Sequence, residues 1–336
     1  MFPGAPRTDA APTNASTKRK RPGGGKLTPG PSGGSWHEYC RLNNRLAPTF
    51  VASDSHTLST FPASESIALR RTVRVGIPFP KPREVKENEA TQTRRNGFAG
   101  IPPSDGFTAH HEVTVECVGM SDRETGYLVG IQELDAVVRT RALPLLQAFC
   151  EGSERITPAD AVRRMSEAVV PAMPKHAEFR SLTWSPGPFV TYSWKTDMPT
   201  FAVMTESFEF SAAHRLHCPG LSDEENRRTF GKCNHPSGHG HNYRVAVAAR
   251  VPTGEHSGSF GSATMEAIVM RTVIDRFDHK HLNVDCAEFA KLNPSVENIA
   301  MVCHRLLAPE LAAAGVEIDH VTVWETEKTS ATYPVR

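Results

Sequence analysis

The sequence predicts an α+β fold in which helices cover one face of an antiparallel sheet, and it predicts this unit twice. Apolar residues occupy every second position in residues 111–118 and again in 243–251, which is the pattern of half-buried strands. Apolar residues at helical spacing follow each of these strands. Because this order recurs, it indicates an internal duplication. We therefore expect three segments, with these boundaries: a tail over 1–68, a first unit over 69–198 and a second unit over 199–336.

The tail is dense in Pro, Gly, Ser and Thr and has no periodic apolar pattern. Such a segment cannot bury enough apolar surface to offset its ordering entropy, so we expect residues 1–68 to be disordered.

In the first unit, alternation over 72–75 and 111–118 predicts two strands. Helical spacing from Ile131 to Leu145 predicts a helix, and Thr157 followed by Pro158 has the form of a cap and first turn of a second helix. A strand over 189–194 ends this unit.

The second unit repeats this order. Strands are expected over 206–210, 243–251 and 321–324, and helices over 265–277 and after Ser295. Between the first two strands, Ser222 followed by three acidic residues has the form of a capping box that opens a short helix.

Composition excludes several classes of function. The chain has 39% apolar residues and a net charge of +1, so it offers no electrostatic basis for a nucleic-acid or acidic-membrane partner. It lacks both the roughly 20 continuous apolar residues of a membrane helix and the apolar region of a secretory signal, so a cytoplasmic location is expected. Seven cysteines at irregular spacing argue against a disulfide framework and for reduced thiols.

Three histidines suggest a metal site. His239 and His241 lie two apart at the start of a strand, so their side chains face one way, and His214 ends the preceding strand. Three protein nitrogens with one open position are typical of a catalytic rather than a structural zinc. The alternative is that these are unrelated surface histidines in a chain with 15 of them.

Other reactive residues lie near these histidines in the sequence. Cys233 stands six positions before His239 in a Gly/Pro-containing loop, where a neighbouring cation or imidazolium lowers a thiol pKa and favours a base or nucleophile. A fourth zinc ligand is the rival role for this cysteine. Asp278 precedes His279, and a carboxylate beside an imidazole can fix its tautomer for proton relay, although adjacent side chains need not touch.

Long stretches of the second unit resemble the 6-pyruvoyl-tetrahydropterin synthase family. The matching stretches are Phe210–Leu216, Leu221–Asn226, Phe230–Tyr243, Phe277–Asn283, Pro294–Ala300 and Val323–Thr326. The resemblance implies a zinc-dependent lyase that acts on 7,8-dihydroneopterin triphosphate, eliminating triphosphate with proton shifts.

The resemblance also implies a role for each site residue. His214, His239 and His241 would bind Zn²⁺, and Cys233 would be the base, with Asp278 and His279 as partners in proton transfer. Glu325 and Glu297 would anchor the pterin ring.

Two other functions remain open. 6-Carboxy-tetrahydropterin synthase of queuosine biosynthesis has the same architecture, metal set and substrate. The five-residue spacer between Cys233 and His239 and the run Ser222–Asn226 favour the pyruvoyl enzyme. A non-catalytic pterin-binding or assembly protein is the alternative of another class, and the intact residue set of the second unit argues against it.

The resemblance further implies the tunnelling fold, in which units join their sheets into a barrel on oligomerisation, so we expect a homo-oligomer. The first unit has Thr108–Glu112 where His-Gly-His would fall and Gln147–Cys150 where Asp-His would fall. We therefore interpret it as a degenerate copy without a metal site. In the second unit, the family's turn and helix start, a Thr-Gly pair followed by two hydrophobic residues and then Asp or Asn, is unclear between Arg250 and Met265.

Overall fold

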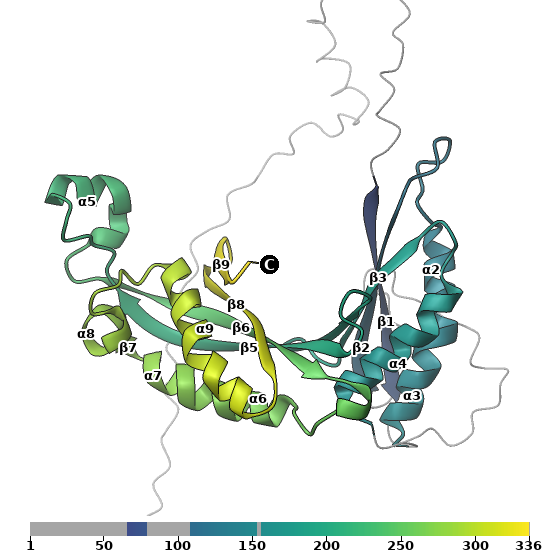
Figure 1. Cartoon of the computed structure of the whole chain (residues 1–336). Helices are drawn as coiled ribbons and strands as arrows, with labels where there is room; N and C mark the ends of the chain where they lie inside the picture. Colours follow the sequence, from purple (N-terminus) through teal and green to yellow (C-terminus); the bar gives the residue numbers. More distant parts are fainter. Residues whose placement is uncertain (1–65, 79–107, 153–155, 336) are drawn as a thin grey trace, which may run out of the picture. The chain divides into compact units, whose positions relative to one another are not determined.

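A nine-stranded sheet runs through the part of the chain that the computed structural model describes, which is residues 66–78, 108–152 and 156–335. The strand order is β1-β2-β3-β4-β5-β6-β8-β9, and neighbours along this path pair antiparallel, with β7 parallel to β5 off the path. The expected antiparallel sheet with helices is confirmed (Figure 1). The sheet does not close within one chain. The expected tail lies outside the described residues up to position 65, and β1 begins at Ile67, inside the expected tail boundary.

We call residues 67–195 the first half. Its elements are β1 (Ile67–Pro78), β2 (Thr108–Gly119), α2 (Ile131–Val137), η2 (Val138–Ala142), α3 (Leu143–Cys150), α4 (Pro158–Val169), η3 (Val170–Ala172), β3 (Glu178–Ser185) and β4 (Val190–Lys195). Helix α4 begins as expected, because the Thr157 side chain accepts a hydrogen bond from the Asp160 N–H and Pro158 occupies the first position.

We call residues 201–333 the second half. Its strands are β5 (Phe201–His214), β6 (His239–Pro252), β7 (Lys280–His281), β8 (Glu317–Thr326) and β9 (Thr329–Tyr333). Its helices are α5 (Asp223–Phe230), η4 (Gly231–Asn234), η5 (Gly254–His256), α6 (Ser262–Val269), η6 (Met270–Ile274), α7 (Asp275–Phe277), α8 (Leu282–Asp285), η7 (Ala287–Phe289) and α9 (Val296–Ala313). Both bonds of the expected capping box form between Ser222 and Glu225.

The sequence patterns missed β3 and β9, and also the two-residue β7. In β3 the buried residues are Phe179, Leu182 and Trp184, so the two-residue period is interrupted where a bulge shifts the register against β2. Strand β9 is short and largely exposed, and it therefore carries no apolar alternation. A single wide turn in each long helix was also missed: η2 and η6 are π-helical turns at the same place in the two halves.

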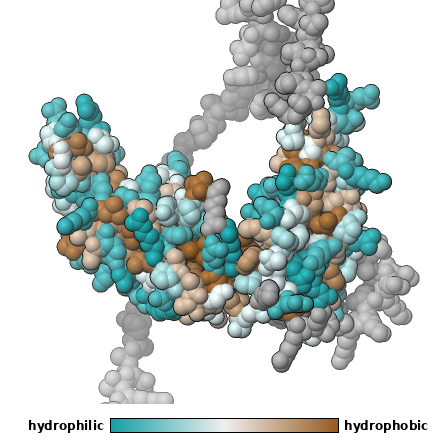
Figure 2. All heavy atoms as spheres, in the orientation of Figure 1, coloured by the Kyte–Doolittle hydropathy of each residue, from teal (hydrophilic) through white to brown (hydrophobic). Residues whose placement is uncertain are grey.

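Helices cover one face of the sheet in each half. In β2 the buried residues alternate with partly exposed ones, and α4 packs on β3, β4 and β5 while α9 packs on β8 and β9. On the face drawn in Figure 2, hydrophilic side chains dominate the helices and hydrophobic residues show in smaller patches between them. Within the described ranges, none of the helices combines the length and the apolar character that crossing a bilayer requires.

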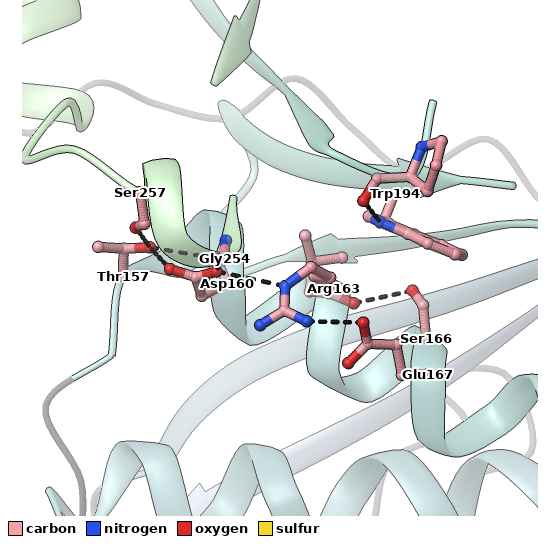
Figure 3. A network of polar contacts seen from close by, with 10 residues as sticks. Thr157, Asp160, Arg163, Ser166, Glu167, Trp194, Gly254 and Ser257 are labelled. Carbon is pink, nitrogen blue, oxygen red and sulfur yellow. Dashed lines mark hydrogen bonds and ion pairs between the residues drawn. The ribbon is translucent and has the colours of Figure 1, made fainter. Parts of the chain in front are cut away.

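A buried carboxylate on α4 connects the two halves (Figure 3). Asp160 accepts hydrogen bonds from the Gly254 N–H at 2.7 Å, the Thr157 hydroxyl at 2.9 Å and Arg163 Nε at 3.3 Å. Burial alone would raise the pKa of Asp160, but the bonds from Gly254, Ser257 and Thr157 outweigh it and lower the pKa. Gly254 follows β6 with a φ of 71°, and its N–H makes this segment a contact with the first half.

Replacing Asp160 should destabilise the protein. Asp160→Ala removes the charged acceptor of the Gly254 N–H, the Thr157 hydroxyl and Arg163, so we expect the free energy of unfolding in urea to fall by about 1–3 kcal/mol at neutral pH. Glu167→Ala is the matched control on the same helix: it removes an exposed partner of Arg163 and should change stability by less than about 0.5 kcal/mol. Since the folded-state pKa of Asp160 is lowered, its contribution is complete above the unfolded pKa of about 3.9 and is lost as the pH falls through the folded pKa. Equal effects of the two substitutions at pH 7 would contradict this assignment.

Candidate metal centre

The pairing of β5 with β6 brings three histidines together. His214 lies directly opposite His239 in the ladder, and Ala212 lies opposite His241. Because alternate residues of a strand share a face, the three imidazoles lie on one side of the sheet. Their ring centroids are 4.6 Å, 4.7 Å and 5.2 Å apart.

The nitrogens of these rings are aimed at one another. His214 Nε2 lies 3.2 Å from His239 Nε2. His214 Nδ1 lies 2.7 Å from the Pro294 carbonyl oxygen, which can only accept, so Nδ1 carries the proton and Nε2 of the neutral ring presents a lone pair. Ligand atoms around a tetrahedral zinc with bonds of about 2.0–2.1 Å are separated by about 3.3 Å. The observed spacing therefore fits a metal ligand set better than a stack of surface rings.

The protonation of the other two rings also suits metal binding. Burial, followed by the neighbouring imidazoles, lowers the pKa of His239. Burial also lowers the pKa of His241, against the opposing charge of Glu325. Both rings are thus neutral near pH 7, which is the form that binds a metal. His241 Nε2 is buried and has no hydrogen-bond partner.

Glu325 completes the cluster. Its Oε1 atom lies 2.9 Å from His241 Nε2 and 3.6 Å from His214 Nε2. The interaction with His214 is the largest cause of a lowered pKa, so the carboxylate is ionised. Among the residues that the structure describes, the group able to hold a metal consists of the three histidines and Glu325, with ligand atoms within 4.8 Å of one another. Sequence reasoning placed Glu325 on the pterin ring and did not anticipate its position among the imidazoles.

Cys233 lies in η4, the short turn that begins at Gly231, and Gly231 has a φ of 55°. Its backbone is fixed to the segment after β5, because the Cys233 carbonyl accepts from the Leu216 N–H at 2.8 Å. It is partly buried and is not a member of the ligand group. Burial, followed by the charge of Glu325, raises the pKa of the thiol. The expected lowering of the thiol pKa by a neighbouring cation or imidazolium is therefore not found.

Asp278 and His279 contact each other directly. His279 Nδ1 lies 2.7 Å from Asp278 Oδ2, and Asp278 Oδ1 accepts from the Ser211 N–H at 2.8 Å. The Ser211 bond, followed by that from His279, lowers the pKa of Asp278. The His279 backbone has a φ of 54° and donates to the Ser211 carbonyl at 2.6 Å, so the sharp turn is tied to β5. The imidazole itself is 83% exposed.

A cavity of about 580 Å³ is lined by one residue of this pair and one of the histidine cluster. His241 and His279 both line it, together with Lys280, His281 and Asp285. The remaining predicted site residue, Glu297, is exposed in the first turn of α9, three residues after the Pro294 carbonyl that holds His214. The structure thus places His241 and His279 on one cavity and leaves Glu297 at its own helix start.

Asparagines fix the segment that follows His214, and sequence reasoning missed them. Asn283 exchanges two hydrogen bonds with the Arg215 backbone, Asn234 donates to the Leu216 carbonyl, and Asn293 accepts from the His217 N–H. The fully buried Asn226 holds the next residue, Cys218, through both its N–H and its carbonyl. An amide side chain can satisfy backbone groups that no strand pairs, but Asn226 lies in α5 and Asn283 in α8, so no local pattern marked these residues.

The first half has other residues at the corresponding places. His111 of β2 is buried, and the Trp184 N–H donates to its Nδ1 at 3.2 Å. Since indole can only donate, the His111 proton lies on Nε2, which is 3.8 Å from Cys150 Sγ. Both nitrogens of this imidazole therefore contact neighbouring side chains.

Tyr243 forms the floor of the cluster. It is fully buried, stacks on Phe210 at 5.1 Å and contacts the rings of His241 and His214 edge-on. Its hydroxyl has no hydrogen-bond partner, and burial, followed by the charge of Glu325, raises its pKa.

Removing this hydroxyl should not destabilise the protein. An unsatisfied buried hydroxyl carries a desolvation cost, so Tyr243→Phe is expected to leave the free energy of unfolding of chelator-treated protein unchanged or to raise it by up to about 1 kcal/mol. Urea unfolding monitored by circular dichroism measures this. A loss above about 1 kcal/mol would show that the hydroxyl makes a stabilising bond.

The comparisons with known proteins concern the same part of the chain. The sequence model of the family described as 6-pyruvoyl tetrahydropterin synthase matches residues 203–335. The 6-pyruvoyl tetrahydrobiopterin synthase of Drosophila melanogaster is 39% identical over 138 residues, covering 39% of this chain and 79% of that protein. The protein of the same name from Homo sapiens is 36% identical over 133 residues, covering 39% and 90%. The solved 6-pyruvoyl tetrahydropterin synthase of Caenorhabditis elegans has 36% identity and a TM-score of 0.37, covering 40% of this chain and 96% of that one.

Proposed function

Because the chain belongs to the 6-pyruvoyl tetrahydropterin synthase family, we propose that its second half is a zinc-dependent lyase acting on 7,8-dihydroneopterin triphosphate. The observation that supports this proposal most directly is the convergence of three imidazoles within the residues that match the family. The reaction eliminates triphosphate and moves protons along the pterin side chain. The product is a 6-pyruvoyl-tetrahydropterin, on the path to tetrahydrobiopterin.

Zn²⁺ is the proposed metal because neutral imidazole nitrogens at tetrahedral spacing suit it. His214, His239 and His241 would hold it, with His214 oriented by the Pro294 carbonyl. When bound, the metal polarises the side-chain oxygens of the substrate, and its charge favours the Cys233 thiolate.

The chain's own groups then move the protons. Cys233 is anchored through its carbonyl on the segment after β5 and would take a proton from the pterin side chain. Asp278 is ionised and accepts from His279 Nδ1, which leaves Nε2 of the exposed ring free to exchange a proton on the shared cavity. Glu325 and Glu297 are the proposed acceptors for pterin ring N–H groups, since carboxylates only accept.

The first half is proposed to be a copy of the same unit without a metal site. The order of strands and helices recurs in it, and so does the rare π-helical turn, as η2 and η6. Strands β1 and β9 end the strand path and leave free edges, through which copies of the chain would join their sheets into a barrel. We also propose a cytoplasmic location, which the six free thiols in the described residues support.

Substitution of Cys233 tests the base role. Cys233→Ala should lower kcat by roughly 10²–10⁴-fold, because a positioned proton-transfer group is lost, while bound zinc stays near one per second half. Triphosphate release and metal analysis measure the two effects. Cys218→Ser is the matched control, because Cys218 is held through its backbone by Asn226 and should retain activity. Loss of zinc together with turnover in Cys233→Ala would instead point to the rival role of metal ligand.

The product separates the candidate functions. Mass spectrometry of the product from 7,8-dihydroneopterin triphosphate is expected to show a pyruvoyl substituent at C6. The five-residue spacer between Cys233 and His239 supports this outcome. A carboxyl substituent with acetaldehyde would identify the 6-carboxy enzyme of queuosine biosynthesis. Absence of turnover in zinc-loaded protein would favour a non-catalytic pterin-binding protein.

A further inference from the structure

Glu325 and His241 are close without being hydrogen-bonded. Glu325 Oε1 lies 2.9 Å from His241 Nε2, yet this nitrogen is buried and has no hydrogen-bond partner, because the geometry of the contact is not that of an N–H···O bond. A cation beside both atoms would satisfy the nitrogen lone pair and the carboxylate charge together. The lone pairs of His214 and His239 Nε2, 3.2 Å apart, are aimed at the same region.

The spacing of the carboxylate is that of a ligand. The distances from Glu325 Oε1 to two imidazole nitrogens, 2.9 Å and 3.6 Å, bracket the separation of about 3.3 Å between neighbouring corners of a tetrahedral zinc. The Glu325 side chain is 15% exposed, so it is withdrawn into the cluster and does not extend into solvent.

The backbone of β8 directs Glu325 into this position. Val323 lies opposite Val245 in the β6–β8 ladder, so by alternation Glu325 shares the face that carries Tyr243 and His241. The β8–β9 register shifts between Trp324 and Thr326, so Glu325 has no partner in β9. The preceding residue is fixed, because the Trp324 ring lies under the Arg244 guanidinium at 4.1 Å.

We propose that Glu325 is the fourth ligand of the metal in the substrate-free protein, so that the centre is closed by three histidines and one carboxylate. This rests on the proposed function for the presence of the metal centre. Glu325 then has a role besides the one that the family resemblance implies, and an incoming substrate competes with a residue of the chain for the fourth corner.

Cobalt binding in the absence of substrate tests this ligand. Co²⁺ is titrated into chelator-treated protein, and its visible absorption reports the ligand set. We expect Glu325→Gln to change the band position or intensity and to weaken Co²⁺ binding by roughly 10–100-fold, a magnitude taken from the loss of groups that support a metal site. Glu297→Gln is the matched control: it removes an exposed carboxylate and should keep the spectrum and affinity of the unsubstituted protein.

Glu325→Asp separates ligation from charge. It keeps the negative charge but withdraws the carboxylate by one methylene, so it should also alter the spectrum and weaken binding. Unchanged spectrum and affinity in Glu325→Gln, or in Glu325→Asp alone, would overturn the proposal while leaving the lyase function standing. The cobalt spectrum of the unsubstituted protein is also compared with that of His239→Ala. If the two spectra are the same, the histidines do not bind the metal, and both the metal centre and the fourth-ligand proposal are wrong. Circular dichroism confirms that each variant is folded, and either Glu325 variant alone decides the question if the other does not fold.

Discussion

The register of one strand pair determines the geometry of the centre. Strands β5 and β6 pair over their whole length, from Phe201 with Pro252 to His214 with His239. A shift by one residue would turn His239 and His241 to the opposite face of the sheet, because side chains alternate with a period of two. The same shift would move Val245 and Val247 off the face that packs into the main hydrophobic core, so the core fixes this register. The packing of the core and the convergence of the imidazoles are therefore one constraint.

Much of the fold could be predicted because its signals are local. Alternation identified β2 and β6, and caps at Thr157, Ser222 and Ser295 identified helix starts whose bonds are present in the structure. Strand β3 escaped because its bulge, which depends on the partner strand, interrupts the alternation. A sequence window cannot contain that information.

The same division holds at the candidate site. The histidines could be proposed from their spacing because two adjacent strands carry them. The position of Glu325 could not, because it depends on the pairing of β8 with β6, and Glu325 lies more than 80 residues farther along the chain than His241. The Pro294 carbonyl that orients His214 has no side-chain signature at all. Sequence patterns therefore indicate which residue types are present, whereas the sheet decides which atoms face each other.

The proposed duplication implies that one scaffold tolerates different polar contents. The region that holds three imidazoles in the second half is served in the first half by His111, whose ring nitrogens are taken up by Trp184 and Cys150. A buried histidine whose nitrogens both have protein partners needs no metal to satisfy it. The scaffold thus keeps its packing whether the side chains at these positions bind a metal or contact only other buried side chains.

The connection between the halves limits how copies of this chain can combine. Only residues 196–200 separate β4 from β5, and the two strands pair with each other, so neither half can be exchanged independently between chains. Any ring formed by joining β1 of one copy to β9 of the next grows by two repeats at a time. The number of repeats in such a ring is even, and the histidine-bearing repeats occupy every second place around it. A relative with one repeat per chain faces no such rule of parity.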